Sequence, residues 1–255
     1  MKDNYRKILI LAAGIGKRLM PLTADRPKCL VEVGGRPILF YQLSALSACG
    51  VKDIIIVTGY RASMIEEYIA ENFSDLRVRF IHDDVATGKL YSWHLAKEVI
   101  TGNQISLDSD IIFHPAIISA ALSLPEETSA GLFYRKKWGE KETKVSVSAD
   151  GRILDIGKDL RPDQTSGKFT GIYVFSEDFS RLFFTAAKEL LNSDGSHAFG
   201  FDAIRKIRDE QNLMLKGLDV SQYPFIEIDF PEDIRTAEKE VLPQINAELT
   251  LRNLS

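Results

Sequence analysis

Residues 7–28 read KILILAAGIGKRLMPLTADRPK, and this stretch decides the fold of the first half of the chain. Its opening part, residues 7–12, is a short apolar run that ends at glycines, a pattern typical of a buried strand. The turn that follows passes through Gly14 and Gly16. Without a Cβ at these positions, backbone N–H groups can approach an oxyanion closely, so the turn suits a phosphate group.

The same stretch is basic, with three cations that suit a polyphosphate: Lys17, Arg18 and Lys28. Two familiar phosphate-binding loops do not match it. In a P-loop the Gly-Lys pair precedes Ser or Thr, whereas Gly16-Lys17 precedes Arg18. A dinucleotide-binding fingerprint needs a third glycine at position 19, which is leucine here. P-loop NTPases and Rossmann dehydrogenases are therefore disfavoured, and a tight turn with a solvated basic face stays an alternative.

Predicted strands and helices alternate through the first half. Strands are expected at 7–12, 53–58, 77–81 and 104–107, and helices at 37–49, 62–71 and 91–100. This order predicts an α/β protein with a Rossmann-like, doubly wound, mixed but mostly parallel sheet in a three-layer αβα arrangement. Such sheets bind ligands at the carboxyl ends of their strands, where the glycine turn lies.

The second half is less regular. Asp150-Gly151 predicts a hairpin between strands at 144–149 and 152–156. Further strands are expected at 169–175 and 224–228, and helices at 177–191, 201–209 and 231–241.

The composition excludes several classes of protein. The chain has 255 residues, a formal charge of −4, 45% hydrophobic and 27% charged residues, which excludes a disordered chain. The mild acidity disfavours nucleic acid and anionic membranes as partners. Two cysteines make no disulfide framework, and no apolar run is long enough to span a membrane, so we expect a soluble, cytoplasmic protein. The scattered histidines show no metal-ligand spacing and no pattern of a hydrolase.

The motif of residues 11–18, followed by Pro21-Leu22-Thr23 and Pro27-Lys28, resembles the signature of the nucleotidyltransferase superfamily. That superfamily includes nucleoside-diphosphate-sugar pyrophosphorylases and small-alcohol cytidylyltransferases. The resemblance covers most of the first 110 residues and resumes near Asp229. It implies the nucleotidyltransferase fold in one domain over 1–255, with an NTP-binding half (1–110), an acceptor-binding half (111–240) and a frayed tail (246–255).

The resemblance also implies roles for individual residues. Lys28 matches a lysine beside the α-phosphate and, with Arg18, is expected to be catalytic. The residues implied to bind the nucleotide are Leu11, Ala12, Ala13, Gly14, Gly16, Lys17 and Gly88.

Carboxylates follow two predicted strands. Two acids that converge on one ligand are costly unless a cation lies between them, and Mg²⁺ takes one or two carboxylates plus phosphate oxygens. The resemblance pairs Asp110 with Asp229 as ligands of Mg²⁺. Asp108 is a candidate supporting or capping residue, and Asp233 is expected to complete a first helical turn.

The sequence gives the weakest indication for the residues that bind the acceptor. Sugar pyrophosphorylases keep small residues where this chain has Tyr91 and Trp93, and the stretch is more similar to the small-alcohol cytidylyltransferases. An aromatic pair can hold an ammonium group, with Asp202 or Glu227 as countercharge; the alternative is that both aromatics belong to the core. Lys158 is expected at the acceptor phosphate, with a solvated surface lysine as the alternative.

These observations favour an Mg²⁺-dependent enzyme that transfers CMP from CTP to a small phosphorylated or phosphonylated alcohol or amine and releases pyrophosphate. The alternative within the class is a sugar-1-phosphate nucleotidyltransferase that uses UTP or GTP. A nucleotide-sensing subunit without turnover is the alternative outside it. The expected partners are an NTP and the acceptor, with no nucleic acid and no membrane insertion; a homodimer is left open.

Overall fold

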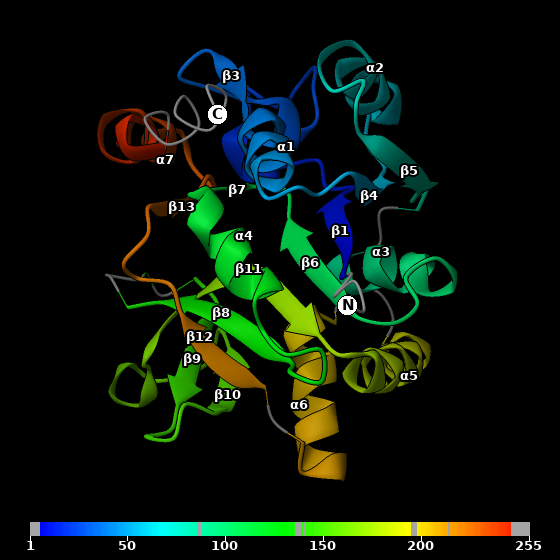
Figure 1. The fold of residues 1–255 in the computed structure, drawn as a ribbon, viewed down its shortest axis with the longest axis vertical. Coiled ribbons are helices and arrows are strands. Elements are labelled where there is room, and N and C mark those ends of the chain that lie inside the picture. Colours follow the sequence, from blue (N-terminus) through cyan, green and yellow to red (C-terminus); the bar gives the residue numbers. More distant parts are fainter. Residues whose placement is uncertain are drawn as a thin grey trace. The chain divides into compact units, whose positions relative to one another are not determined.

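The computed structural model describes residues 6–85, 88–135, 139, 141–194, 198–213 and 215–245, so the predicted tail at 246–255 lies outside the described residues. The chain groups into two compact units of three segments each. We call residues 8–86, 108–123 and 223–255 the glycine-loop unit, and residues 1–7, 87–107 and 124–222 the hairpin unit. This grouping does not follow a single boundary at residue 110. Figure 1 shows the ribbon with its elements labelled.

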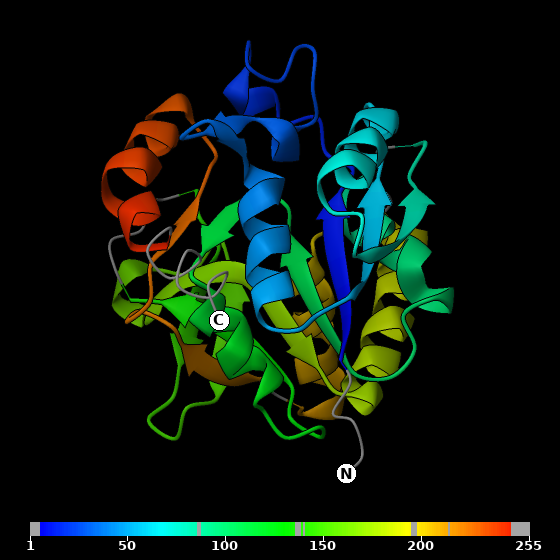
Figure 2. The same ribbon diagram turned by 45° about the horizontal axis from the view of Figure 1, so that its top comes forward.

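The glycine-loop unit is built on three parallel strands in the order β1 (Lys7–Ala12), β4 (Asp53–Thr58) and β5 (Arg77–His82). Figure 2 shows β1, in blue, beside β4, in cyan. Their register aligns Ala12 with Thr58 and Thr58 with His82, so the carboxyl ends of the three strands lie level. The predicted strands 7–12 and 53–58 are confirmed at these bounds.

The helices of this unit are α1 (Ile38–Ala48), α2 (Ala62–Asn72), α4 (Pro115–Leu122) and α7 (Pro231–Thr236), the last continued by a π turn (Ala237–Val241). Two short ribbons complete it: β2 (Glu32–Val33) with β3 (Arg36–Pro37), and β7 (Ile111–Phe113) with β13 (Phe225–Glu227).

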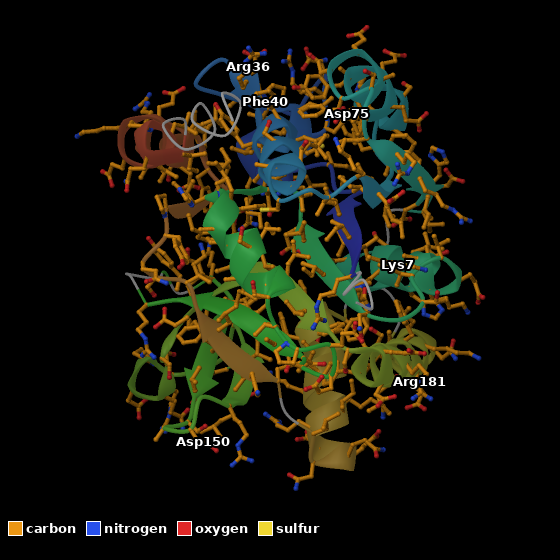
Figure 3. All side chains as sticks on the ribbon, in the orientation of Figure 1. Lys7, Arg36, Phe40, Asp75, Asp150 and Arg181 are labelled. Atoms are coloured by element: carbon orange, nitrogen blue, oxygen red, sulfur yellow. The ribbon has the colours of Figure 1, made fainter. Side chains whose placement is uncertain are left out.

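Helix α1 is buried on most sides and anchors the ribbon of β7 and β13. Its buried Gln42 donates hydrogen bonds from Nε2 to the backbone oxygens of Asp108 (2.7 Å) and Ile111 (3.0 Å). Buried polar groups are retained where they are hydrogen-bonded, so Gln42 fixes the backbone on both sides of Asp110. At the start of the helix, the Arg36 guanidinium lies 4.9 Å from the centroid of the Phe40 ring (Figure 3).

The hairpin unit carries a mixed sheet in the order β10-β9-β11-β6, with β8 between β11 and β12. Its strands are β6 (Gln104–Asp108), β8 (Ala130–Tyr134), β9 (Lys144–Val147), β10 (Ile153–Gly157), β11 (Gly167–Phe175) and β12 (Lys216–Asp219). Its helices are α3 (Lys89–Leu95), α5 (Glu177–Asp194) and α6 (Gly200–Gln211). The predicted hairpin is confirmed as β9 and β10. A mixed sheet with flanking helices confirms the predicted α/β class.

No helix among the described residues combines the length and the apolar character needed to cross a membrane.

Candidate active site

The glycine turn lies at the carboxyl end of β1. Leu11, Ala12 and Ala13 are buried there, and the carbonyl of Ala13 accepts a hydrogen bond from the Tyr60 N–H at 3.3 Å. A Cβ on Gly14 would meet no protein atom within 4 Å. The packing of the protein therefore does not by itself require a glycine at position 14.

Gly16 is required by the protein itself. Its φ of +72° lies in the left-handed range, and a Cβ there would come within 2.8 Å of the Cβ of Lys28. The Gly16 carbonyl accepts hydrogen bonds from the Thr23 hydroxyl and the Leu19 N–H, both at 3.0 Å. A side chain at position 16 would displace Lys28, so this glycine sets the position of the lysine.

A two-stranded ribbon brings the predicted metal ligands together. Asp110 precedes β7 and Asp229 follows β13, and the two strands pair antiparallel with Glu227 opposite Ile111. The Ile228 N–H donates to the Asp110 carbonyl at 2.8 Å, which extends the ribbon to the two aspartates. Asp110 and Asp229, which are 119 positions apart in the sequence, thus become neighbours through backbone hydrogen bonds.

Lys28 lies between the two aspartates. Its Nζ donates to Asp110 Oδ2 at 2.8 Å and to Asp229 Oδ1 at 2.7 Å, and all three side chains are at most 18% exposed. Burial alone would lower the pKa of Lys28, but the charges of Asp110 and Asp229 outweigh it and raise the pKa above its ordinary value. The two carboxylates therefore favour the charged form of Lys28.

Arg18 and Asp233 complete the surroundings of Asp229. Arg18 Nη2 lies 2.7 Å from Asp229 Oδ1, and its guanidinium lies 5.4 Å from the centroid of the Phe230 ring. Asp233 Oδ2 accepts from the N–H groups of Asp229 (2.9 Å) and Phe230 (2.7 Å). This confirms the prediction that Asp233 serves the first turn of its helix, and it fixes the backbone that carries Asp229.

The acids fit a divalent cation. Asp110, Asp229 and Glu227 each offer a carboxylate oxygen, and these oxygens lie within 4.8 Å of one another. Mg²⁺ prefers carboxylate oxygens together with phosphate oxygens. Glu227, which the sequence suggested for the acceptor, is thus beside the two predicted metal ligands. The sequence did contain a signal for this position. Glu227 is two residues from Asp229, and residues i and i+2 of an extended segment lie on the same face.

Cys29 follows Lys28 but offers no nucleophile. The side chain is buried, and burial raises the pKa of its thiol to about 12. A thiol with this pKa stays protonated near neutral pH. Because the thiolate is the reactive form of cysteine, Cys29 is not a nucleophile there.

Lys17 is exposed directly after Gly16 in the glycine-loop unit. The remaining predicted site residues lie in the hairpin unit: Gly88, Tyr91, Trp93, Lys158 and Asp202. Gly88 precedes α3 with a φ of +150°, and its carbonyl accepts from the Ser92 N–H at 3.1 Å. Tyr91 is half-buried.

Trp93 has no exposed surface and belongs to the aromatic core. Its ring centroid lies 4.5 Å from that of Phe183, 4.8 Å from that of Tyr173 and 5.7 Å from that of Phe175. A ring enclosed in this way has no face left for an acceptor. The burial matches the alternative considered for Trp93, so we do not place it in the acceptor pocket.

Lys158 and Asp202 lie at facing ends of β10 and α6. Asp202 Oδ2 accepts from the Phe199 N–H at 2.8 Å and so caps its helix. Lys158 is exposed, and its Nζ lies 4.5 Å from the centroid of the Phe199 ring. Phe199 is a neighbour that the sequence did not suggest, because an isolated phenylalanine before a helix carries no signal of its own.

The family model described as "Nucleotidyl transferase" matches residues 7–222, so the chain belongs to the nucleotidyltransferase family. Within that family, the chain is 28% identical to CMP-5'-(3-aminopropyl)phosphonate synthase of Streptomyces rubellomurinus, over 97% of this chain and 41% of that protein. It is 31% identical to a bifunctional IPC transferase and DIPP synthase of Aquifex aeolicus, over 91% of this chain and 50% of that protein. The chain thus spans half or less of the length of these two relatives.

The fold matches a solved structure of the inositol-1-phosphate CTP transferase from T. maritima, with a TM-score of 0.81 and 23% identity. The match covers 96% of this chain and 98% of the other. It confirms the predicted nucleotidyltransferase fold.

Proposed function

We propose that this protein transfers CMP from CTP to a small phosphorylated or phosphonylated alcohol or amine and releases pyrophosphate. The observation that carries the proposal is the position of Lys28, held between Asp110 and Asp229 and against Gly16. The similarity to a CMP-phosphonate synthase and to an IPC transferase supports a small acceptor.

The glycine turn would hold the triphosphate. The open space at Gly14 lets backbone N–H groups approach an anion, and Lys17 and Arg18 supply positive charge beside it. Leu11, Ala12 and Ala13 would present backbone to the base. A nucleotide-binding role for Gly88, which the family resemblance implies, stays a prediction.

Transfer needs no covalent enzyme intermediate. An anionic oxygen of the acceptor forms a bond to the α-phosphorus as the bond to the bridging oxygen of the leaving pyrophosphate breaks. The electron pair of the broken bond stays on pyrophosphate, so no proton has to be moved. Lys28 and Arg18 would neutralise the charge that develops on the transferring and leaving groups.

Asp110 and Asp229, with Glu227 as a further donor, would hold Mg²⁺. The ion would add positive charge next to the phosphates. Lys28 Nζ donates to both aspartates, so the same carboxylates would hold the lysine and the ion.

The acceptor would be held by Lys158 through its phosphate or phosphonate group, with Tyr91 and Asp202 beside it. Trp93 is left out because it is buried. A cytoplasmic location and a homodimer stay predictions.

The experiment that tests this function is a pyrophosphate-release screen of the four NTPs against phospho-alcohols, phosphonates and sugar 1-phosphates. We expect release with CTP and a small acceptor. Release with UTP or GTP and a sugar 1-phosphate would replace the proposal with a sugar nucleotidyltransferase. Nucleotide binding without release under any condition would favour a sensing subunit.

A further inference from the structure

The segment between the glycine turn and Lys28 is largely exposed. Residues 17–27, which we call the basic loop, contain three cationic side chains. Met20 is 54% exposed and Leu22 is 42% exposed, so the middle of the loop gains little stability from burial. A loop of this kind loses conformational freedom when it closes on a ligand, and contacts that order it beforehand reduce that loss.

Tyr60 joins the basic loop to the glycine turn. It lies between β4 and α2, where its N–H donates to the Ala13 carbonyl at 3.3 Å and its hydroxyl donates to the Ala24 carbonyl at 2.7 Å. The adjacent Gly59 packs closely as well, since a Cβ there would lie 2.9 Å from the Ala13 oxygen. Tyr60 therefore spans from the start of the glycine turn to the far end of the basic loop.

Arg61 orients the Tyr60 hydroxyl. Its Nε donates to the Tyr60 hydroxyl oxygen at 3.0 Å, and its guanidinium lies 5.5 Å from the centroid of the Tyr60 ring. A tyrosine hydroxyl has one hydrogen, so a hydroxyl that accepts from Arg61 keeps that hydrogen for Ala24. The two hydrogen bonds therefore form one chain from Arg61 through Tyr60 to the basic loop.

The backbone of Arg61 is strained. Its φ of +51° and ψ of +45° lie in the left-handed region, which is unfavourable for a residue with a Cβ. Among the described residues, Arg61 and Asn212 are the two residues other than glycine with a positive φ. Such strain persists where surrounding contacts enforce it, and it concentrates at active sites and ligand clamps. Its position, at the residue that orients Tyr60, indicates that this contact has a function.

We infer that Tyr60 and Arg61 form a hydrogen-bonded clamp that holds the basic loop in the position that binds the triphosphate of the nucleotide. This inference rests on the proposed function. The clamp orders the loop before the nucleotide arrives, so binding does not have to supply that order. Both are positioning residues, because they act through the loop, and clamp and loop belong to the glycine-loop unit.

The test measures the dissociation constants of CTP and CMP by isothermal titration calorimetry with Mg²⁺ present. Only CTP carries the β- and γ-phosphates. We expect Tyr60→Phe, which keeps the ring and removes the hydroxyl, to weaken CTP binding roughly fivefold, the usual effect of losing one hydrogen bond. CMP binding should not change. Tyr68→Phe is the matched control, since Tyr68 is a half-buried tyrosine on α2 in the same unit, and it should change neither constant.

Arg61→Gly distinguishes a clamp from a contact that only stabilises the fold. Glycine adopts the left-handed conformation without strain, so the melting temperature should rise by roughly 2–4 °C while CTP binds severalfold more weakly. Loss of a merely stabilising contact would not raise the melting temperature and weaken CTP binding together. Asn212→Gly is the control, because Asn212 has a φ of +50° at the end of α6 in the hairpin unit. It should leave CTP binding unchanged.

Unchanged CTP affinity in both Tyr60→Phe and Arg61→Gly, or equal losses for CTP and CMP, overturns the clamp while the transferase function stands. Titration with the other NTPs separates the two proposals. If the wild-type protein binds UTP or GTP in place of CTP and the variants weaken that binding, the clamp stands and CTP as the donor is overturned. A wild-type protein that binds none of the four NTPs overturns both.

Discussion

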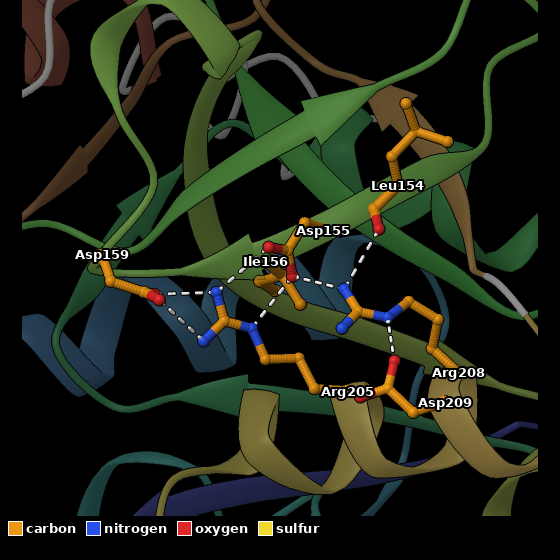
Figure 4. Close-up of polar contacts among 7 residues, drawn as sticks. All are labelled: Leu154, Asp155, Ile156, Asp159, Arg205, Arg208 and Asp209. Carbon is orange, nitrogen blue, oxygen red and sulfur yellow. Dashed lines mark hydrogen bonds and ion pairs between the residues drawn. The ribbon is translucent and has the colours of Figure 1, made fainter.

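Among the described residues, each unit carries a cluster of charged side chains built on short ion pairs, and the comparison of these two clusters is informative. In the glycine-loop unit, Lys28 lies between Asp110 and Asp229. In the hairpin unit, Asp155 lies between Arg205 and Arg208 (Figure 4). The contacts are equally short, at 2.7–2.9 Å, so distance alone does not distinguish a catalytic centre from a structural network.

The two clusters differ in the burial of their side chains, in the number of acids, and in the segments of the chain that supply them. Lys28 and its partners are 12–18% exposed, they are joined by a further acid, and they come from distant segments beside a glycine turn. Asp155 is 35% exposed and joins one strand to one helix through well-satisfied hydrogen bonds. A concentration of partly buried acids beside a glycine turn indicates a ligand, whereas the second cluster holds two elements together.

The largest effect should come from Lys28→Ala. We expect kcat to fall by ~10²–10³-fold, the usual effect of losing a contact to the transition state, while KM for CTP changes only a few-fold. Steady-state kinetics checks this. Lys52→Ala is the control, because the exposed pair of Lys52 with Asp75 should contribute little. A kcat within a few-fold of the wild type would remove Lys28 from the catalytic centre.

The next largest effect should come from Asp110→Asn and Asp229→Asn, because each removes a proposed ligand of the metal. Each should raise the Mg²⁺ concentration needed for half-maximal rate by about 10–100-fold or more. Loss of a residue that only hydrogen-bonds a metal ligand already has an effect of this size. Metal titrations of the rate measure the effect, and Glu232→Gln, an exposed acid on α7, is the control. Wild-type Mg²⁺ dependence in either variant would exclude that aspartate as a ligand.

Gly16→Ala should have an intermediate effect. The new Cβ would lie 2.8 Å from the Cβ of Lys28, so the lysine must shift, and a displacement of about 1 Å can cost up to ~10²-fold in rate. Gly50→Ala introduces the same strain of a positive φ with no neighbour within 4 Å. Comparing kcat and melting temperature of both variants separates strain from the displacement of Lys28. Equal losses in the two variants would contradict the coupling of Gly16 to Lys28.

The smallest effect should come from Asp155→Asn in the hairpin unit. Loss of about 1 kcal/mol from a partly exposed network should lower the melting temperature by ~2–4 °C in a chain of this size. KM for CTP should not change, because no member of the network lies in the glycine-loop unit. Asp163→Asn, an exposed acid 3.5 Å from Arg161, serves as the control. A large change in KM for CTP would show that the second cluster is more than structural.

Local sequence patterns predicted the strands that carry the glycine turn, since an apolar run bounded by glycines is a local signal. The pairing of Asp110 with Asp229 followed from the family resemblance, and its physical cause is the ribbon of β7 and β13. Of these two short strands, β13 was predicted within residues 224–228. Strands β7 and β8 and helix α4 were not predicted, because strands of three to five residues depend on partners far away in the sequence.

The side-chain environments were harder to predict than the elements. Helical spacing allowed Trp93 to face either the core or a pocket, and only the packing of Phe175 and Phe183 decides for the core. Glu227 was predicted at the acceptor, whereas the position of Asp110 and Asp229 beside it favours the metal. The contact of Phe199 with Lys158 joins residues more than 40 positions apart, so no local pattern predicts it.

The most direct test of the central claim is the fate of the α-phosphate of CTP, followed by ³¹P NMR during incubation with Mg²⁺ and 2-aminoethylphosphonate. We expect a new anhydride between CMP and the phosphonate, formed together with one equivalent of pyrophosphate. CTP that is only hydrolysed, or that binds and persists unchanged with this and every other small phosphorylated acceptor, would contradict it.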